Sequence, residues 1–181
     1  MKTNTVGYTH EISLVREAQG GSKEAFCELY DLYKDKLYRY ALYKLGCPED
    51  AEDAVSECVL AAWQSLPQLR NEAAFGSWIF RILHNCCVRH INEAVSMREN
   101  MQGIYESGHA SGSADGPEHT QMSAELNEAL AILSENERSI VLLSVIGGLS
   151  SRDISDITAL TPGSVRSSLS RSLAKMRDFL S

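Results

Sequence analysis

The C-terminal segment of the chain places arginines and small hydroxyl side chains at helical spacing. A helix is predicted from Pro162 to about Leu180. Its apolar side carries Val165, Leu169, Leu173 and Met176. Its polar side carries Ser164, Arg166, Ser167, Ser170, Arg171 and Lys175. Arginine can donate two parallel hydrogen bonds to guanine or contact phosphate, and small side chains permit close approach to a groove. The pattern indicates a DNA-binding helix. The alternative is an amphipathic helix whose basic face is solvated and binds no ligand.

A second helix with polar groups opposite an apolar stripe is predicted in the segment FGSWIFRILHNCCVRH. Its polar side carries Arg81, His84, Asn85, Arg89 and His90. Asparagine and arginine at helical spacing can face a nucleic acid. Many surface helices share this pattern, so by itself it is a weak indication.

The run from Pro48 to Glu57 presents carboxylates on one helical face. Asp50, Asp53 and Glu57 follow at spacings of three and four residues. Such a face can bind a metal, dock a basic partner or simply be solvated, and periodicity does not choose among these. Acid–base catalysis would need a pocket around the carboxylates.

Other reactive residue types are too few or too isolated to form a recognisable site. His84, Cys86 and Cys87 lack the second ligand pair of a zinc site. The tyrosines between Tyr30 and Tyr43 fit core packing better than base stacking. We therefore predict no catalytic residue, no metal and no cofactor.

These residues need helices to position them, and the chain predicts an all-α fold. After a short amphipathic segment, Glu11 to Ala18, the predicted helices are 22–46, 48–66, 72–93, 123–133, 134–146, 151–159 and 162–180. Expected caps include Ser22, a Ser134–Glu137 capping box, Ser150, and Thr161 with Pro162. The last two helices, joined by the turn from Leu160 to Gly163, form a predicted helix-turn-helix.

Periodicity is lost from about Ala94 to Thr120, where SGHASGSADGPEH is rich in Gly, Ser and Asp. This predicts a flexible linker over 94–122 between two small helical domains, 1–93 and 123–181.

Charge and hydropathy restrict the partners and the location. The chain has 181 residues, with 17 Lys and Arg against 24 Asp and Glu, a formal net charge of −7. Proteins that hold DNA alone usually carry a basic excess, so a larger partner should supply most of the attraction to DNA. No apolar run approaches the roughly 20 residues of a membrane span, and no signal segment is recognised. We expect a cytoplasmic protein with five reduced cysteines.

The order of these segments resembles the extracytoplasmic-function (ECF) group of bacterial sigma factors in the sigma-70 family. The matching stretches are FCELYDLYKDKLYRYA, PEDAEDAVSECVLAAW and FGSWIFRILHN in the first lobe, and LSENERSIVLLSVIGGLSSRDISDITALTPGSVRSSLSRSLAKMRDFL in the second. The resemblance implies a two-lobed factor that binds core RNA polymerase and directs promoter recognition. It also implies an anti-sigma partner, often membrane-anchored.

The resemblance also implies roles for individual positions. Polymerase docking falls on Asp53, Ser56 and Glu57. The segment from Asn71 to Ser77 matches the loop that captures a flipped base of the minus-ten element. Contacts to that element fall on Asn71, Trp78, Arg81, Asn85 and Arg89. The helix with Arg166, Ser167, Ser170 and Arg171 matches the one that enters the major groove at the minus-thirty-five element.

The chain departs from the family pattern at a few of these places. Ser56 stands where Gln is common, Arg89 where Asp is common, and Asn92 where a basic residue follows. Ser134 replaces the proline of a usual Leu-Pro pair.

Two other functions are compatible with the residues. One is a stand-alone helix-turn-helix regulator with an N-terminal input or dimerisation domain, which would bind DNA tightly without polymerase. The other is a helical enzyme or metal protein that uses the His, Cys and carboxylate groups.

Overall fold

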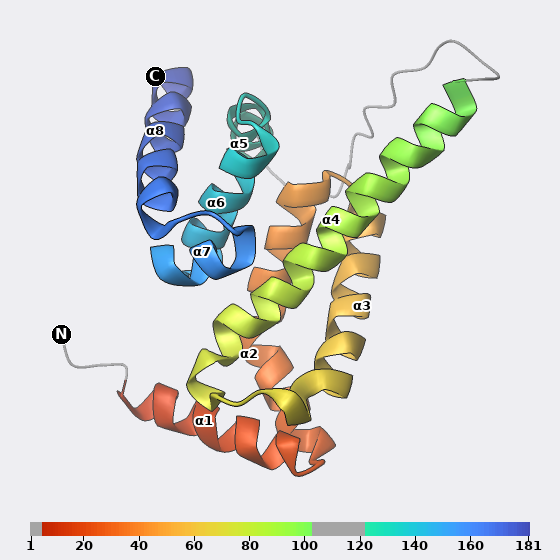
Figure 1. Ribbon diagram of the computed structural model, residues 1–181, viewed down its shortest axis with the longest axis vertical. Coiled ribbons are helices and arrows are strands. Elements are labelled where there is room, and N and C mark those ends of the chain that lie inside the picture. Colours follow the sequence, from red (N-terminus) through yellow and green to blue (C-terminus); the bar gives the residue numbers. More distant parts are fainter. Residues whose placement is uncertain (1–4, 103–121) are drawn as a thin grey trace.

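The computed structural model describes residues 5–102 and 122–181, and every regular element in these ranges is helical. The first lobe consists of α1 (Thr5–Gln19), α2 (Lys23–Leu45), α3 (Pro48–Ser65), the 3-10 helices η1 (Leu66–Gln68) and η2 (Glu72–Ala74), and α4 (Phe75–Gln102). The second lobe consists of α5 (Met122–Ala131), α6 (Glu135–Val145), α7 (Ser151–Thr158) and α8 (Pro162–Leu180). The prediction of two all-α lobes is confirmed (Figure 1).

The helix ends follow the caps predicted from the sequence. Ser22 Oγ accepts a hydrogen bond from the backbone N–H of Ala25 at 3.2 Å. Ser134 and Glu137 form the predicted capping box, and Thr161 caps α8 ahead of its first-turn proline. α2 ends at Gly46, whose φ of 74° lies in the left-handed region that favours glycine.

α4 is longer than predicted. The expected end was Glu93, whereas the helix continues to Gln102, so the first part of the predicted linker is helical. Residues 94–102 lack an apolar stripe, but they contain no Gly or Pro and several strong helix formers. Helix propensity therefore extends α4 beyond the stretch that packs on the core. Residues 103–121 of the predicted linker lie outside the described residues.

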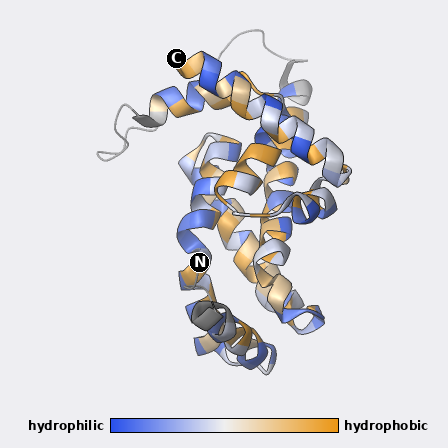
Figure 2. Ribbon diagram, turned by 90° about the vertical axis from the view of Figure 1, so that its left-hand side faces the viewer, coloured by the Kyte–Doolittle hydropathy of each residue, from blue (hydrophilic) through white to orange (hydrophobic). Residues whose placement is uncertain are grey.

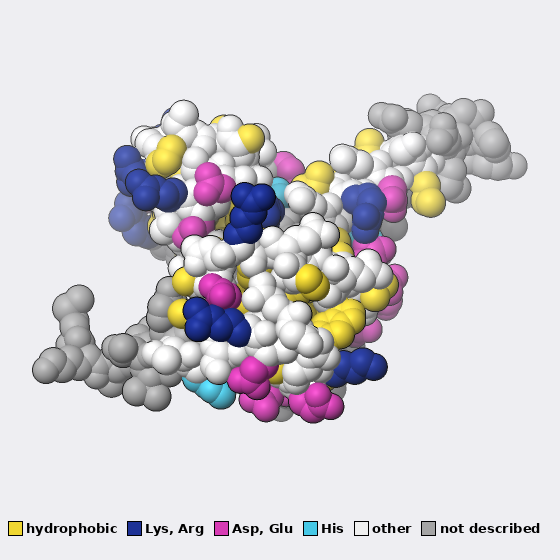
Figure 3. All heavy atoms as spheres, turned by 60° about the horizontal axis from the view of Figure 1, so that its bottom comes forward, with side chains coloured by type: hydrophobic (Ala, Val, Ile, Leu, Met, Phe, Trp, Pro, Cys, Tyr) yellow, Lys and Arg dark blue, Asp and Glu magenta, His cyan; other side chains and the backbone are white. Residues whose placement is uncertain are grey.

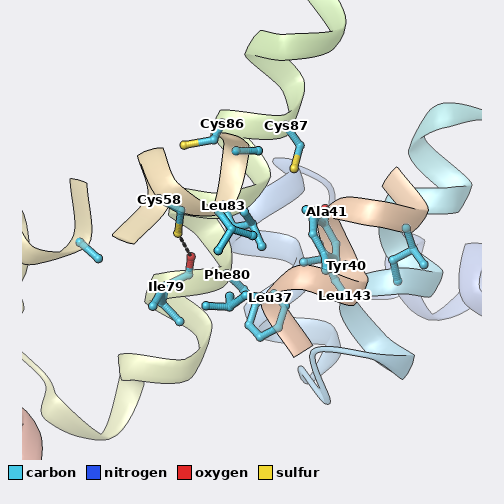
Figure 4. Close-up of a cluster of buried hydrophobic side chains, with 14 of the residues drawn as sticks. Leu37, Tyr40, Ala41, Cys58, Ile79, Phe80, Leu83, Cys86, Cys87 and Leu143 are labelled. Atoms are coloured by element: carbon cyan, nitrogen blue, oxygen red, sulfur yellow. Dashed lines mark hydrogen bonds between the residues drawn. The ribbon is translucent and has the colours of Figure 1, made fainter. Parts of the chain in front are cut away.

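The core lies where the helices face one another, and hydrophilic residues cover the outer faces (Figure 2). Its largest fully buried side chains include Tyr40, Phe75 and Phe80. Tyr40 and Phe80 make an edge-to-face contact with ring centroids 5.8 Å apart. Leu143 of α6 reaches this cluster beside Leu37, Tyr40 and Ala41 of α2 (Figure 4). The two lobes therefore share apolar contacts as well as a chain connection.

A charged pair also joins the lobes. The side chain of Lys44 in α2 is fully buried, and its ammonium donates to Glu135 and, at 2.6 Å, to Ser139 Oγ, both in α6. Burial lowers the pKa of Lys44, because an ammonium loses hydration there. Glu135 and Ser139 thus compensate a charge that water cannot reach.

Replacing Glu135 with glutamine is expected to lower the free energy of unfolding by about 2 kcal/mol, because it removes the counter-ion of a buried ammonium. This is less than for a fully buried pair, since 51% of the Glu135 side chain is exposed. Urea denaturation measures the change.

Glu128→Gln, in the exposed part of α5, is the matched control. Lys44→Met removes the buried charge itself and should stay within about 1 kcal/mol of the wild type. Equal stabilities of the Glu135→Gln and Glu128→Gln variants would refute the role of the pair.

The apolar side of α8 differs from the prediction at one turn. Val165 and Met176 are buried as expected, but Leu173 is 43% exposed and Ser172 is fully buried in its place. Ser172 Oγ has no hydrogen-bond partner among the described residues. The predicted stripe was chosen by residue type, whereas the angle at which α8 meets α5, α6 and α7 decides which side chains are covered.

Candidate nucleic-acid and partner-binding surfaces

The turn between α7 and α8 presents the second helix of a helix-turn-helix. Ser155 Oγ donates to the carbonyl oxygen of Leu160 at 2.5 Å, and Thr161 Oγ1 accepts from the N–H of Ser164 at 3.2 Å. Ile154, fully buried, holds α7 against the lobe. These local contacts leave the outer side of α8 exposed.

The exposed side of α8 carries four residues of the predicted DNA-binding set, which we call the recognition face: Arg166, Ser167, Ser170 and Arg171. Arg171 Nε donates to the carbonyl oxygen of Ser167 at 3.2 Å, which directs its guanidinium along the helix. Arg166 makes no hydrogen bond or ion pair within the part of the chain that the structure describes. Lys and Arg gather on the second lobe, at the upper left of Figure 3.

Two other members of the predicted set have partners inside the lobe. Ser164 Oγ lies 2.9 Å from Thr161 Oγ1, in the cap of α8. Lys175 Nζ donates to Glu137 Oε1 at 2.7 Å and so ties α8 to α6. Hydrogen bonds from Lys175 and from the backbone of Ser134 lower the pKa of Glu137 to about 2. Lys175 is thus less available to a ligand than the arginines.

The connection between α3 and α4 holds Asn71 at its surface. Asn71 Oδ1 accepts from the N–H of Ala73 at 3.2 Å and caps η2. Ser77 Oγ donates to the carbonyl oxygen of Ala74 at 3.1 Å, and the rings of Trp78 and Phe75 lie 5.7 Å apart. Trp78 is half-buried.

The outer side of α4 carries Arg81, Asn85 and Arg89, all exposed and each four residues from the next. They lie along one side of the helix, as predicted. Arg89 is engaged, because its guanidinium donates to Glu57 of α3.

The exposed face of α3 carries Asp53, Ser56 and Glu57, which we call the α3 acidic face. Acidic side chains line the right-hand edge of Figure 3, on the side of α3. Leu60, one turn further along, is 59% exposed and adds an apolar group that charge patterning did not reveal. The sequence does contain an indication of this exposure, because Leu60 is an apolar residue that falls outside the buried stripe of α3.

Glu57 joins two surfaces that the sequence analysis treated separately. Its carboxylate accepts from Arg89 and lies 3.3 Å from His90 Nε2. The α3 acidic face and the exposed side of α4 therefore meet at this cluster. The contact spans more than thirty residues of sequence, which helical periodicity cannot detect.

His84 does not belong to the exposed polar side of α4, which corrects the prediction. It is partly buried, and its Nδ1 lies 2.8 Å from the hydroxyl of the fully buried Tyr40. Burial and the nearby Lys44 ammonium lower the pKa of His84 to about 4. Tyr40 is a core residue, as predicted, although Tyr30 and Tyr33 are only partly buried.

The cysteines of α3 and α4 lie in the core. Burial raises the pKa of Cys87 to about 12 and raises the pKa of Cys58 and Cys86 as well, so all three thiols stay protonated near neutral pH. Among the residues that the structure describes, no three His, Cys, Asp or Glu side chains are grouped to hold a metal ion. No described helix combines the length and apolar character of a membrane span.

Two family models match this chain. Residues 29–95 match the family model described as Sigma-70 region 2, and residues 123–176 match the model described as Sigma-70, region 4. The chain is 25% identical over 179 residues to ECF RNA polymerase sigma factor SigW of Bacillus subtilis, covering 90% of this chain and 92% of the relative. It is 29% identical over 171 residues to the ECF RNA polymerase sigma-E factor of Haemophilus influenzae, covering 88% and 89%.

Two solved structures share the fold. CnrH in complex with the cytosolic domain of CnrY superposes with a TM-score of 0.71 at 20% identity, covering 94% of this chain and 97% of that chain. The sigma factor RpoE in complex with the anti-sigma factor NepR, from Bartonella quintana, gives 0.70 at 22% identity, covering 86% and 96%.

Proposed function

This chain belongs to the ECF group of the sigma-70 family, and from that premise we propose which of its surfaces carry out the function of a sigma factor. It binds core RNA polymerase and directs promoter recognition at transcription initiation. Polymerase supplies the chemistry, and this chain supplies recognition without a catalytic residue of its own. It acts in the cytoplasm, where polymerase binds the promoter.

The first lobe, from α1 to α4, docks on polymerase and binds the minus-ten element. The α3 acidic face provides exposed carboxylates for a basic surface of polymerase, and Leu60 adds an apolar contact at its edge. The connection that holds Asn71, with Trp78 beside it, offers a polar edge and an aromatic face to an unstacked base. Arg81 and Asn85 continue that surface along α4.

The second lobe, 123–181, binds the minus-thirty-five element through the recognition face of α8. The observation that carries this assignment is the exposure of Arg166 and Arg171 on the second helix of a helix-turn-helix. Arginine is the usual reader of guanine in the major groove. The net charge of −7 agrees with this assignment, because polymerase supplies most of the electrostatic attraction to DNA.

We also propose that an anti-sigma factor regulates the chain. In both solved structures named above the similar chain is bound to a second protein, and in one of them that protein is the anti-sigma factor NepR. Such a partner would cover the α3 acidic face or the recognition face and so block initiation.

The experiment is promoter-dependent transcription with purified core RNA polymerase, with and without this chain, on a library of promoter fragments. Asp53→Ala/Glu57→Ala should weaken binding to core polymerase about tenfold, since it removes two charges of the docking face. The matched control is Glu125→Ala/Glu128→Ala, which removes two exposed carboxylates from α5. Binding can be measured by fluorescence anisotropy.

No transcript and no binding to core polymerase, together with a specific DNA shift by the chain alone, would refute the sigma assignment. The stand-alone helix-turn-helix regulator would then be the better description.

A further inference from the structure

We propose that α1 positions the connection between α3 and α4, residues 66–77, and that Gln19 is the main positioning residue. The inference rests on the proposed function, in which this connection captures a base of the minus-ten element. α1 lies before the start of the region 2 match at residue 29. Figure 1 shows it across the end of the first lobe, next to this connection.

Gln19 holds the beginning of the connection at two points. Its side-chain amide Nε2 donates to the carbonyl oxygen of Leu66 at 3.1 Å and to that of Leu69 at 2.7 Å. An amide nitrogen has two hydrogens, so a single side chain can satisfy both carbonyl groups. The two carbonyls belong to the first residue of η1 and to the residue that follows this helix, and the contacts define the path of the backbone just before Asn71.

Arg16 holds the middle of the connection. Its Nε donates to Glu72 Oε1 at 3.1 Å, and Glu72 is the first residue of η2. Hydrogen bonds from the backbone N–H of Glu72 and from Arg16 lower the pKa of the Glu72 carboxyl. The contact is partly solvated, with 66% of the Arg16 side chain exposed, so it contributes less than the Gln19 contacts.

Tyr33 links α1 to the C-terminal end of the connection, near Phe75 and Gly76. Its hydroxyl donates to Glu11 Oε1 of α1 at 2.8 Å. A Cβ atom at position 76 would lie 2.8 Å from the same hydroxyl oxygen, so Gly76 permits the close approach of the tyrosine. The ring of Tyr33 also packs edge-to-face on Phe75, with centroids 5.5 Å apart.

The three contacts are distributed along the whole connection, near residues 66–69, 72 and 76. A loop that receives a ligand binds more tightly and selectively when its bound conformation is already populated, because less ordering is required. Loss of the Gln19 contacts would remove the donor to the Leu69 carbonyl, leave the Leu66 carbonyl with only the N–H of Leu69, and let the backbone before Asn71 move. The geometry therefore links α1 to the selectivity of the base-binding loop.

The test compares Gln19→Met with the wild type, both assembled with core polymerase. Methionine has a similar length but no N–H donor. We expect the preference for the best minus-ten sequence over single-base variants to fall about tenfold, as for the loss of two part-buried hydrogen bonds. Affinity for core polymerase should stay within about twofold, because the α3 acidic face is untouched.

Ser13→Met, at an exposed position of α1 itself, is the matched control. Gln19→Lys, which retains N–H donors, should recover much of the preference. Hydrogen exchange gives a direct physical readout: amides of residues 69–74 should exchange about tenfold faster in Gln19→Met than in the wild type. If Gln19→Met fails to fold, Arg16→Met, at an exposed side chain, should show the same change to a smaller extent.

An equal loss on all promoters, without a change in preference, would assign Gln19 a purely structural role and overturn the inference. Unchanged preference and unchanged exchange would overturn it as well. A wild-type chain that shows no base preference with core polymerase would instead overturn the proposed function, and this inference with it.

Discussion

Replacing both Arg166 and Arg171 with alanine is expected to lower promoter-dependent transcription about 100-fold or more. Each arginine that contacts a base or phosphate through a fork of hydrogen bonds contributes about 1–3 kcal/mol, and the two lie on one exposed face of α8. Transcription from a minus-thirty-five-dependent promoter at limiting concentration of the chain measures the loss. Affinity for core polymerase should be preserved, because α3 lies on the other lobe.

Lys175→Ala is the matched control on the same helix. Lys175 is a surface cation too, but its ammonium is held by Glu137 at 2.7 Å. We expect a loss of less than about fivefold from this variant. If Lys175→Ala reduces transcription as much as the double arginine variant, the recognition face would extend further toward the C-terminal end of α8, and its restriction to a surface without Lys175 would be wrong.

Acidification from pH 6.5 to pH 4 is expected to remove about 3 kcal/mol of stability through His84 alone. Its pKa in the folded protein is about 4, against an ordinary value of 6.5. Protonation therefore favours the unfolded chain, and the contribution of neutral His84 to stability is complete above pH 6.5 and lost toward pH 4. The cause is burial, reinforced by the nearby Lys44 ammonium and weakened by the Glu135 carboxylate.

Urea denaturation between pH 4 and pH 7 measures this loss as the difference between the wild type and His84→Gln. Glutamine cannot take up a proton in this range, so the variant should lose less stability on acidification. Carboxyl groups titrate in both proteins and largely cancel in the difference. His10→Gln, at an exposed histidine, is the control and should follow the wild type. Parallel curves for the wild type and His84→Gln would contradict the prediction.

The helices and their ends were predictable because their signals are local. Ser22, Ser134, Ser150 and Thr161 cap helices where the sequence indicates, since a cap needs only a side chain and an amide within three residues. The end of α4 was not predictable in this way. The loss of an apolar stripe marks where packing stops, whereas the helix itself continues for as long as its residues favour it.

Within the candidate surfaces, the sequence predicted residue types and the tertiary structure decided their availability. Arg166 and Arg171 are exposed as predicted, while Lys175, on the same polar side, is bound to Glu137. Arg89 has the helical spacing of Arg81 and Asn85 but pairs with Glu57. His84 shares that helix and lies against Tyr40.

The sequence by itself determined the all-α class, the helix-turn-helix and the two lobes, because helical periodicity and capping act within about four residues. The family followed from the resemblance of several stretches in the right order. Only the tertiary structure decided that Gln19 supports Leu69, that Lys175 pairs with Glu137, and that Lys44 pairs with Glu135. These partners lie 50, 38 and 91 residues apart along the chain. Their contacts depend on how helices pack against one another, and packing angles arise from the whole set of interlocking side chains rather than from any local pattern.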